Sequence, residues 1–198
     1  MRLAHIADVH ITERRPAFGG ADLDEQARIL DWIATDISGD PVDLVAIAGD
    51  LYDAESTPAE REVAADWIVH LAKSAPVVIV KGNHDQPRDL ALLWRLATRC
   101  EVRVFEQPAL LALRRGTLGE LCGLTDRDIG VIILALPWPR KAELAARLPA
   151  GAALDLDTAA TGAMRALLLG YRAQLAEHRA RGFVPIVGVG HLELGAAL

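Results

Sequence analysis

The sequence predicts a single large α/β domain. Short stretches rich in valine and isoleucine alternate with segments of helical periodicity, and the first eighty residues follow a β-α-β-α-β order. The chain has 198 residues, of which 52% are hydrophobic. This composition is sufficient to bury one sizeable core, and a second full domain is not expected.

The elements follow from periodicity and from helix-start signals. The predicted strands cover residues 2–7, 43–48, 76–80, short pieces near 102–113, 130–135 and 184–190. The predicted helices cover about 23–37, 58–73, 88–98 and 156–180, whereas 140–162 shows little periodic contrast. The second helix has a clear start, because Thr57 can cap it, Pro58 suits the first helical position and Glu60 completes a capping box.

Composition also limits the class of protein. The longest apolar run, VIILAL at 131–136, is far shorter than the roughly 20 residues that span a bilayer, so we expect neither a membrane segment nor a signal peptide. Cys100 and Cys122 have no CxxC spacing, which favours a reduced, cytoplasmic protein. The formal net charge of −6 argues against a large basic surface for nucleic acid.

Polar side chains with metal-binding chemistry follow several predicted strands. They are Asp8 and His10 in IADVH, Asp50 in IAGD, Asn83, His84 and Asp85 in KGNHD, and His191 after the last strand. The carboxyl ends of strands in α/β sheets open into a common crevice, so residues distant in sequence can converge there. In the D-x-H motif, the two side chains fall on the same side of an extended segment and can grip one ion.

Carboxylate, imidazole and amide groups form a mixed ligand set. Such a set suits Mn²⁺, Fe²⁺ or Zn²⁺ better than the all-oxygen cages of Ca²⁺. Two metals about 3.5 to 4 Å apart would clamp the oxygens of an in-line displacement at phosphorus and supply hydroxide. Asp50 is central in the pattern and is the candidate bridge between two ions.

Single motifs carry less weight than the ordered set. A lone D-x-H is usually a turn or a surface pair, whereas GNHD after an apolar strand is specific, and D-x-H, GD, GNHD and GH in order favour a metal site. The remaining histidines have simpler interpretations: His5 packs within the first strand, His70 lies on a helix and His178 lies in a polar run. We expect these three to be structural or solvent-facing.

With these motifs the chain resembles the calcineurin-like metallophosphoesterases, and within them the SbcD-type nucleases of double-strand-break repair. The narrower resemblance rests on IADVHI near the start, LDWI at 30–33, GDLYDAESTP at 49–58, LPWPR at 136–140 and PIVGVGHLELGA at 185–196. It implies a four-layer α/β/β/α sandwich with a mixed central sheet, extending over residues 1–198 as a phosphoesterase core.

The resemblance also implies a role for each residue. Asp8 and His10 would hold one metal, Asp50 would bridge, and Asn83 and His191 would hold the second, with Mn²⁺ the expected ion at both positions. His84 would act on the phosphate or protonate the leaving 3′ oxygen, and Asp85 would orient His84. The family takes two more ligands from a later G-H-x-H motif, which these 198 residues do not contain. We therefore expect a core that is incomplete at its C-terminal end.

The function implied is that of a metal-dependent DNA exonuclease and endonuclease working with an SbcC-like, SMC-type ATPase. DNA and this ATPase are the expected partners, and relatives are commonly homodimers. Arg14 and Arg15 could contact a DNA backbone, although paired arginines in loops are more often only solvated. The alternatives are a small-molecule phosphodiesterase or phosphatase with the same metal centre, and a non-catalytic assembly role.

Overall fold

The computed structural model describes residues 1–14, 22–96, 98–121, 129–140, 156–181 and 184–192. Arg15, Cys122 and residues 193–196 of the last family-like segment lie outside this set, as does most of 140–155. The chain divides into two compact units, Met1–Trp138 with Val187–Leu198, and Pro139–Ile186.

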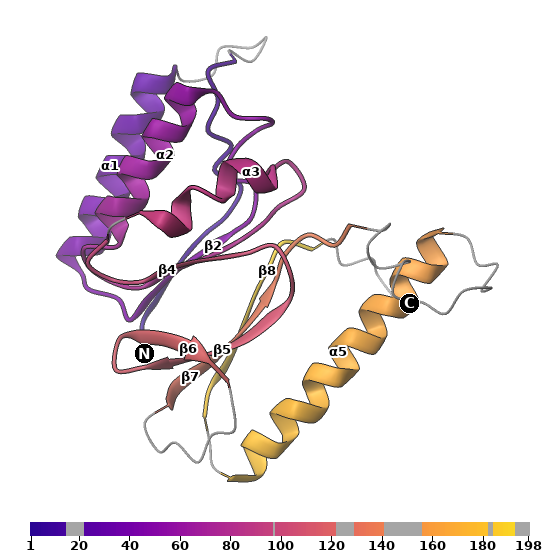
Figure 1. The fold of residues 1–198 in the computed structure, drawn as a ribbon. Helices are drawn as coiled ribbons and strands as arrows, with labels where there is room; N and C mark the ends of the chain where they lie inside the picture. Colours follow the sequence, from indigo (N-terminus) through magenta and orange to yellow (C-terminus); the bar gives the residue numbers. More distant parts are fainter. Residues whose placement is uncertain (15–21, 97, 122–128, 141–155, 182–183, 193–198) are drawn as a thin grey trace. The chain divides into compact units, whose positions relative to one another are not determined.

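The first unit begins with a parallel sheet. Its strands are β1 (Leu3–Ile6), β2 (Leu44–Ala48), β3 (Val77–Val80) and β4 (Val102–Phe105), in the spatial order β1-β2-β3-β4. Helix α1 (Leu23–Gly39) connects β1 to β2, and α2 (Pro58–Leu71) connects β2 to β3. Parallel strands require such crossovers, which explains the alternating order in the sequence. The two helices lie side by side against this sheet (Figure 1).

Both faces of the parallel sheet are buried. One face packs on α1 and α2 and carries Val45, Ile47, Val77 and Ile79. The opposite face packs on a second sheet and carries Leu44, Ala46, Val78 and Val80. Alternate residues of a strand point to opposite faces, so a strand buried on both sides must be apolar throughout. This is why the sequence shows continuous apolar runs here.

The second sheet contains antiparallel strands. Its order is β6-β5-β7-β8, from β5 (Ala109–Arg114), β6 (Thr117–Glu120), β7 (Ile129–Leu136) and β8 (Ile186–Gly190). A tight turn joins β5 to β6, with positive φ at Arg115 (46°) and Gly116 (81°). Sequence reasoning did not separate β6 as a strand, because TLGE has no alternating apolar pattern.

The helix predicted at 88–98 is wrong in length. The structure has a four-residue helix α3 (Pro87–Leu90) and a three-residue 3₁₀ turn η1 (Leu93–Arg95). Leu90 and Leu93 are fully buried, and this spacing of three residues fits 3₁₀ geometry. Leu96 then adopts an extended conformation, which ends the segment. Leu90 ends α3 and Leu93 begins η1, and both side chains pack into the core at this break.

Other helix predictions are confirmed. Thr57 and Glu60 form the predicted capping box of α2, and Asp22 caps α1 by accepting a hydrogen bond from Glu25 N. In the second unit, α5 (Leu156–Arg181) covers the helix predicted at 156–180. Among the described residues, no helix is long and apolar enough to cross a membrane. The α/β fold class is confirmed, with its parallel and antiparallel strands sorted into two sheets.

Candidate metal centre

The candidate site lies where β1, β2 and β3 end, and the backbone there is unusual. Asp8, His10 and Asp50 have positive φ angles of 55°, 52° and 49°. Non-glycine residues rarely adopt this conformation and pay a free-energy cost for it. Two backbone hydrogen bonds hold the segment, from Asp8 N to Gly49 O (3.2 Å) and from His10 N to Asp50 O (3.0 Å). These bends turn the side chains toward one another.

Two glycines allow the chain segments to approach closely. A Cβ atom on Gly49 would lie 2.4 Å from the His191 ring, and a Cβ on Gly82 would lie 2.0 Å from Asp50 Oδ1. Atoms cannot approach this closely without displacement of one segment, and Gly49 also has a φ of 81°. The glycines before Asp50 and Asn83 are therefore required by packing at the site.

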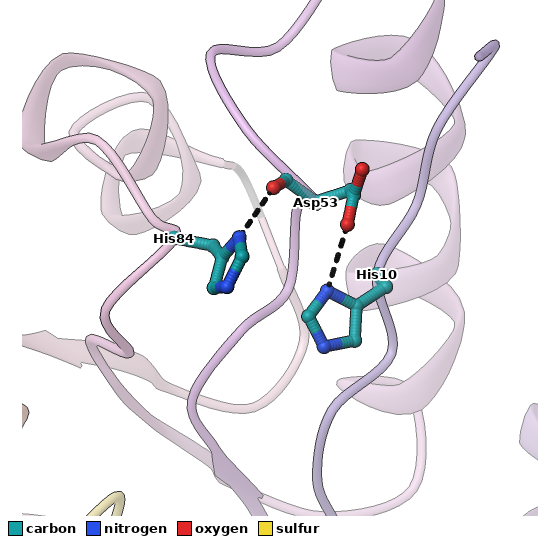
Figure 2. A group of neighbouring side chains, drawn as sticks. All are labelled: His10, Asp53 and His84. Atoms are coloured by element: carbon teal, nitrogen blue, oxygen red, sulfur yellow. Dashed lines mark hydrogen bonds and ion pairs between the residues drawn. The ribbon is translucent and has the colours of Figure 1, made fainter.

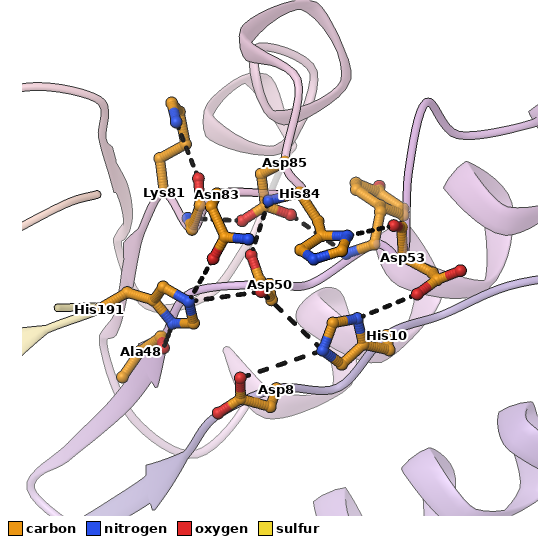
Figure 3. Close-up of polar contacts among 12 residues, drawn as sticks. Asp8, His10, Ala48, Asp50, Asp53, Lys81, Asn83, His84, Asp85 and His191 are labelled. Carbon is orange, nitrogen blue, oxygen red and sulfur yellow. Dashed lines mark hydrogen bonds and ion pairs between the residues drawn. The ribbon is translucent and has the colours of Figure 1, made fainter. Parts of the chain in front are cut away.

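One group of ligand atoms comes from Asp8, Asp50 and His191, whose donor atoms all lie within 4.8 Å of one another. His191 Nδ1 donates to Ala48 O at 2.9 Å, which leaves Nε2 free to accept. That Nε2 lies 3.3 Å from Asp50 Oδ2 and 2.9 Å from Asn83 Oδ1 (Figure 3). The structure therefore brings Asn83 and His191, 108 positions apart, into contact.

Asp50 lies between two imidazoles. His10 Nε2 is 3.9 Å from Asp50 Oδ2 and 3.9 Å from Asp8 Oδ1, while His191 approaches Asp50 from the other side (Figure 3). The Asp50 residue is only 3% exposed. This geometry fits the bridging position expected from the sequence.

His84 lies beside this group and is held by its backbone and its ring. Its backbone N donates to Asp50 Oδ1 at 2.9 Å, and its Nδ1 lies 2.6 Å from the carbonyl oxygen of Asp53. Because a carbonyl only accepts, Nδ1 carries the proton and Nε2 faces outward as an acceptor. The ring packs edge-on against His10, with ring centres 5.2 Å apart.

Asp85 follows His84 directly but its carboxylate has other partners. It accepts hydrogen bonds from Gly82 N (2.8 Å) and Tyr52 N (3.1 Å), and the residue is 1% exposed. Burial raises the pKa of Asp85, and the backbone donors oppose this shift. Asp85 thus holds the loop that carries His84, while the His84 ring itself is oriented by Asp53.

Asp53 is a site residue that sequence reasoning missed. Its carboxylate lies 3.3 Å from His10 Nδ1, so one residue faces both His10 and His84 (Figure 2). The available signal was its position three residues after Asp50 in GDLYD. Histidines that bind metals commonly donate their other ring nitrogen to a carboxylate, and Asp53 places its carboxylate beside that nitrogen of His10 as an ion-pair partner.

The residues present fit divalent metal ions. Carboxylates and imidazole nitrogens converge in two groups, Asp8–Asp50–His191 and His10–Asp53–His84. His10 Nδ1 is buried without a hydrogen bond of good geometry, although the Asp53 carboxylate faces it. Adjacent acidic groups repel unless a positive charge lies between them, so a cation would stabilise this arrangement.

Comparison with known proteins agrees with this fold. Residues 1–148 match the family profile described as calcineurin-like phosphoesterase. The chain therefore belongs to the calcineurin-like phosphoesterase family.

Curated relatives give a narrower similarity. The chain is 33% identical over 98 residues to the SbcD component of the SbcCD nuclease of Bacillus subtilis, covering 46% of this chain and 24% of the relative. It is 29% identical over 141 residues to the SbcD component of the Escherichia coli K12 nuclease, covering 65% and 34%. The chain thus spans about a quarter to a third of the length of these relatives.

Proposed function

We propose that this chain forms the metal centre of a DNA phosphodiesterase of the SbcD type. The observation that carries the proposal is the convergence of Asp8, Asp50 and His191 within 4.8 Å, with Asn83 on His191 and His10 on Asp50. The partial similarity to the SbcD components of two SbcCD nucleases supports DNA as the substrate class.

The proposed ligand roles follow the family resemblance, which assigns Asp8 and His191 of the converging group to different ions that share Asp50. Asp8, His10 and Asp50 would hold one divalent ion, Asp50, Asn83 and His191 would hold the second, and Mn²⁺ is the proposed ion. When bound, the metals supply a positive charge near the phosphate and a hydroxide at neutral pH. Asp50 Oδ2 is oriented toward both imidazoles, which suits a carboxylate shared by two ions.

His84 is the proposed catalytic residue. Its Nδ1 proton is fixed on Asp53 O, so Nε2 is the atom available to the scissile phosphate or the leaving oxygen. When protonated, Nε2 would donate to the oxygen that develops negative charge. Asp85 supports His84 indirectly. Its buried carboxylate accepts hydrogen bonds from Tyr52 N and Gly82 N and so fixes the backbone of the two loops beside the site.

The expected partners are DNA and an SbcC-like ATPase in the cytoplasm, and the homodimer expected from the resemblance stays a prediction. A small-molecule phosphodiesterase or a phosphatase would use the same metal centre. A non-catalytic assembly role is the remaining alternative, and metal content separates it from both enzymes.

The test uses a version of the chain that continues through a G-H-x-H motif. Mn²⁺ stoichiometry is measured by calorimetry, and nucleotide release is measured on linear double-stranded DNA. We expect His84→Ala to abolish cleavage while Mn²⁺ binding persists, because His84 is proposed to act on the phosphate and is not one of the proposed metal ligands. Asp50→Ala is expected to lose both.

The control is His70→Ala, since His70 lies on α2 and pairs with Asp31 on α1. Loss of Mn²⁺ in the His84 variant would contradict its assigned role. Turnover of small diesters or monoesters with no cleavage of DNA would favour the small-molecule alternative. No Mn²⁺ binding by the unmodified protein would favour the assembly role.

A further inference from the structure

Two chain segments beside the site are joined by four contacts. Segment 52–56 follows the bridging carboxylate, and segment 84–89 carries the catalytic imidazole and α3. Tyr52 N donates to Asp85 Oδ1 (3.1 Å), and Asp53 O accepts from His84 Nδ1 (2.6 Å). Further along, an ion pair joins Glu55 to Arg88 and Ser56 N donates to Asp89 Oδ2 (2.9 Å). The segments are therefore held together at both ends.

Of the two contacts at the end farther from the site, the one between Ser56 and Asp89 is buried. Asp89 is 3% exposed and Ser56 is 6% exposed, whereas the side chains of Arg88 and Glu55 are 63% and 66% exposed. A carboxylate buried in this way is stable only with charged or hydrogen-bonding partners. The exposed pair is solvated and contributes little. At this end of the two segments, the buried contact of Asp89 therefore stabilises the structure more than the exposed pair of Glu55 and Arg88.

Arg61 completes the buried contact from α2. Its Nη1 lies 3.5 Å from Asp89 Oδ1 and donates to Ser56 O (2.6 Å) and Ser56 Oγ (3.1 Å). Both backbone polar groups of Ser56 are thus bound, the N–H by Asp89 and the carbonyl by Arg61. This leaves the loop little freedom to move away from α3.

The loop matters because it orients the His84 ring. The only ring hydrogen bond recorded for His84 among the described residues is the one to Asp53 O, three positions before Ser56. A shift of the loop would displace Asp53 O and release the ring. Displacements of about 1 Å near a reacting centre can cost on the order of 100-fold in rate.

We propose that Asp89, together with Arg61, is a positioning residue that locks segment 52–56 against segment 84–89 and thereby orients His84 through Asp53. Asp89 is not one of the proposed metal ligands, and its partners are Ser56, Arg61 and Arg88. The inference rests on the proposed function for its catalytic consequence. Its structural part, the orientation of His84, stands independently of any activity.

The experiment uses the version of the chain that continues through a G-H-x-H motif, and it has two readouts. The first is the ¹H–¹⁵N NMR resonance of the His84 Nδ1–H, assigned by its loss in His84→Gln. The second is kcat for hydrolysis of bis(p-nitrophenyl) phosphate at saturating Mn²⁺. We expect Asp89→Ala to shift or broaden the resonance and to lower kcat by about tenfold or more, with Mn²⁺ affinity and KM within about twofold of wild type.

Two further variants separate positioning from stability. Asp89→Asn keeps an oxygen that can accept from Ser56 N, so we expect it to restore the resonance and most of kcat. Glu55→Ala is the matched control, because it removes the exposed ion pair with Arg88 across the same two segments and leaves every partner of Asp89 in place, so it should behave as wild type. A purely structural role would lower the melting temperature while leaving kcat of the folded protein and the resonance unchanged.

The resonance and kcat of the Asp89→Ala and Arg61→Ala variants decide whether Asp89 positions His84. A folded Asp89→Ala protein with the wild-type resonance and kcat overturns it. Should that variant not fold, Arg61→Ala removes the other anchor of the loop, and wild-type values in that variant overturn the inference. Absence of hydrolysis by the wild-type chain counts against the proposed function alone, since the NMR comparison still decides the positioning role.

Discussion

At the scale of single residues, the site depends on backbone conformations that most side chains avoid. Asp8, His10 and Asp50 are bent into positive φ, and each is a polar residue at the end of a strand or a few steps beyond it. Strain of this kind persists only where surrounding contacts impose it, and it is frequent at functional sites. The neighbouring glycines make those contacts sterically possible.

Gly82 packs so closely against Asp50 that it leaves no room for a side chain. Gly82→Ala would place a methyl group 2.0 Å from Asp50 Oδ1 and 2.3 Å from Asp50 N, so Asp50 must move. We expect a loss of about 1 to 3 kcal/mol in the free energy of unfolding and weaker Mn²⁺ binding. Urea unfolding and calorimetry measure the two effects. Gly119→Ala is the control because nothing lies within 4 Å of its Cβ position, and equal behaviour of the two variants would refute the close-packing argument.

At the scale of elements, the start of α2 contacts two segments that leave the site, the one after His10 and the one after Asp50. Glu60, the third helical residue in its capping box, is 4% exposed and accepts hydrogen bonds from Thr57 N (2.8 Å) and Glu13 N (2.6 Å). The helix start is thereby fixed to the segment after His10 and to the loop after Asp50. Local capping chemistry, visible in the sequence, also serves the tertiary structure here.

The capping box gives a stability prediction. Thr57→Ala removes the hydroxyl that accepts from Glu60 N at 3.2 Å, and we expect a loss of about 1 kcal/mol in the free energy of unfolding. Thr57→Ser keeps the hydroxyl and should lose much less. Denaturant unfolding followed by circular dichroism measures both. Identical losses in the two variants would show that the hydroxyl is not the stabilising group.

At the scale of the whole molecule, the proposed ligand assignment predicts how tightly these 198 residues bind metal. In the proposed assignment each metal position has three protein ligands, and Asp50 is counted in both. We predict that the 198-residue chain binds Mn²⁺ weakly and releases few nucleotides from linear double-stranded DNA. A version that continues through a G-H-x-H motif is expected to bind tightly and to cleave.

Both versions are compared at matched concentration with excess Mn²⁺. Robust and equal nucleotide release by the shorter chain would mean that the two additional histidines are dispensable. The ligand assignment would then have to be replaced.

The sequence by itself determined the α/β class, the capped start of α2 and the group of strand-end residues, because these depend on local periodicity and on specific short motifs. It did not determine the break between α3 and η1 or the strand β6, since burial of Leu90 and Leu93 and pairing with β5 decided them. The partner of the His84 ring was also decided by tertiary structure. Asp85 is adjacent in sequence, but chain packing brings the Asp53 carbonyl to Nδ1, and a contact between separate loops leaves no local pattern.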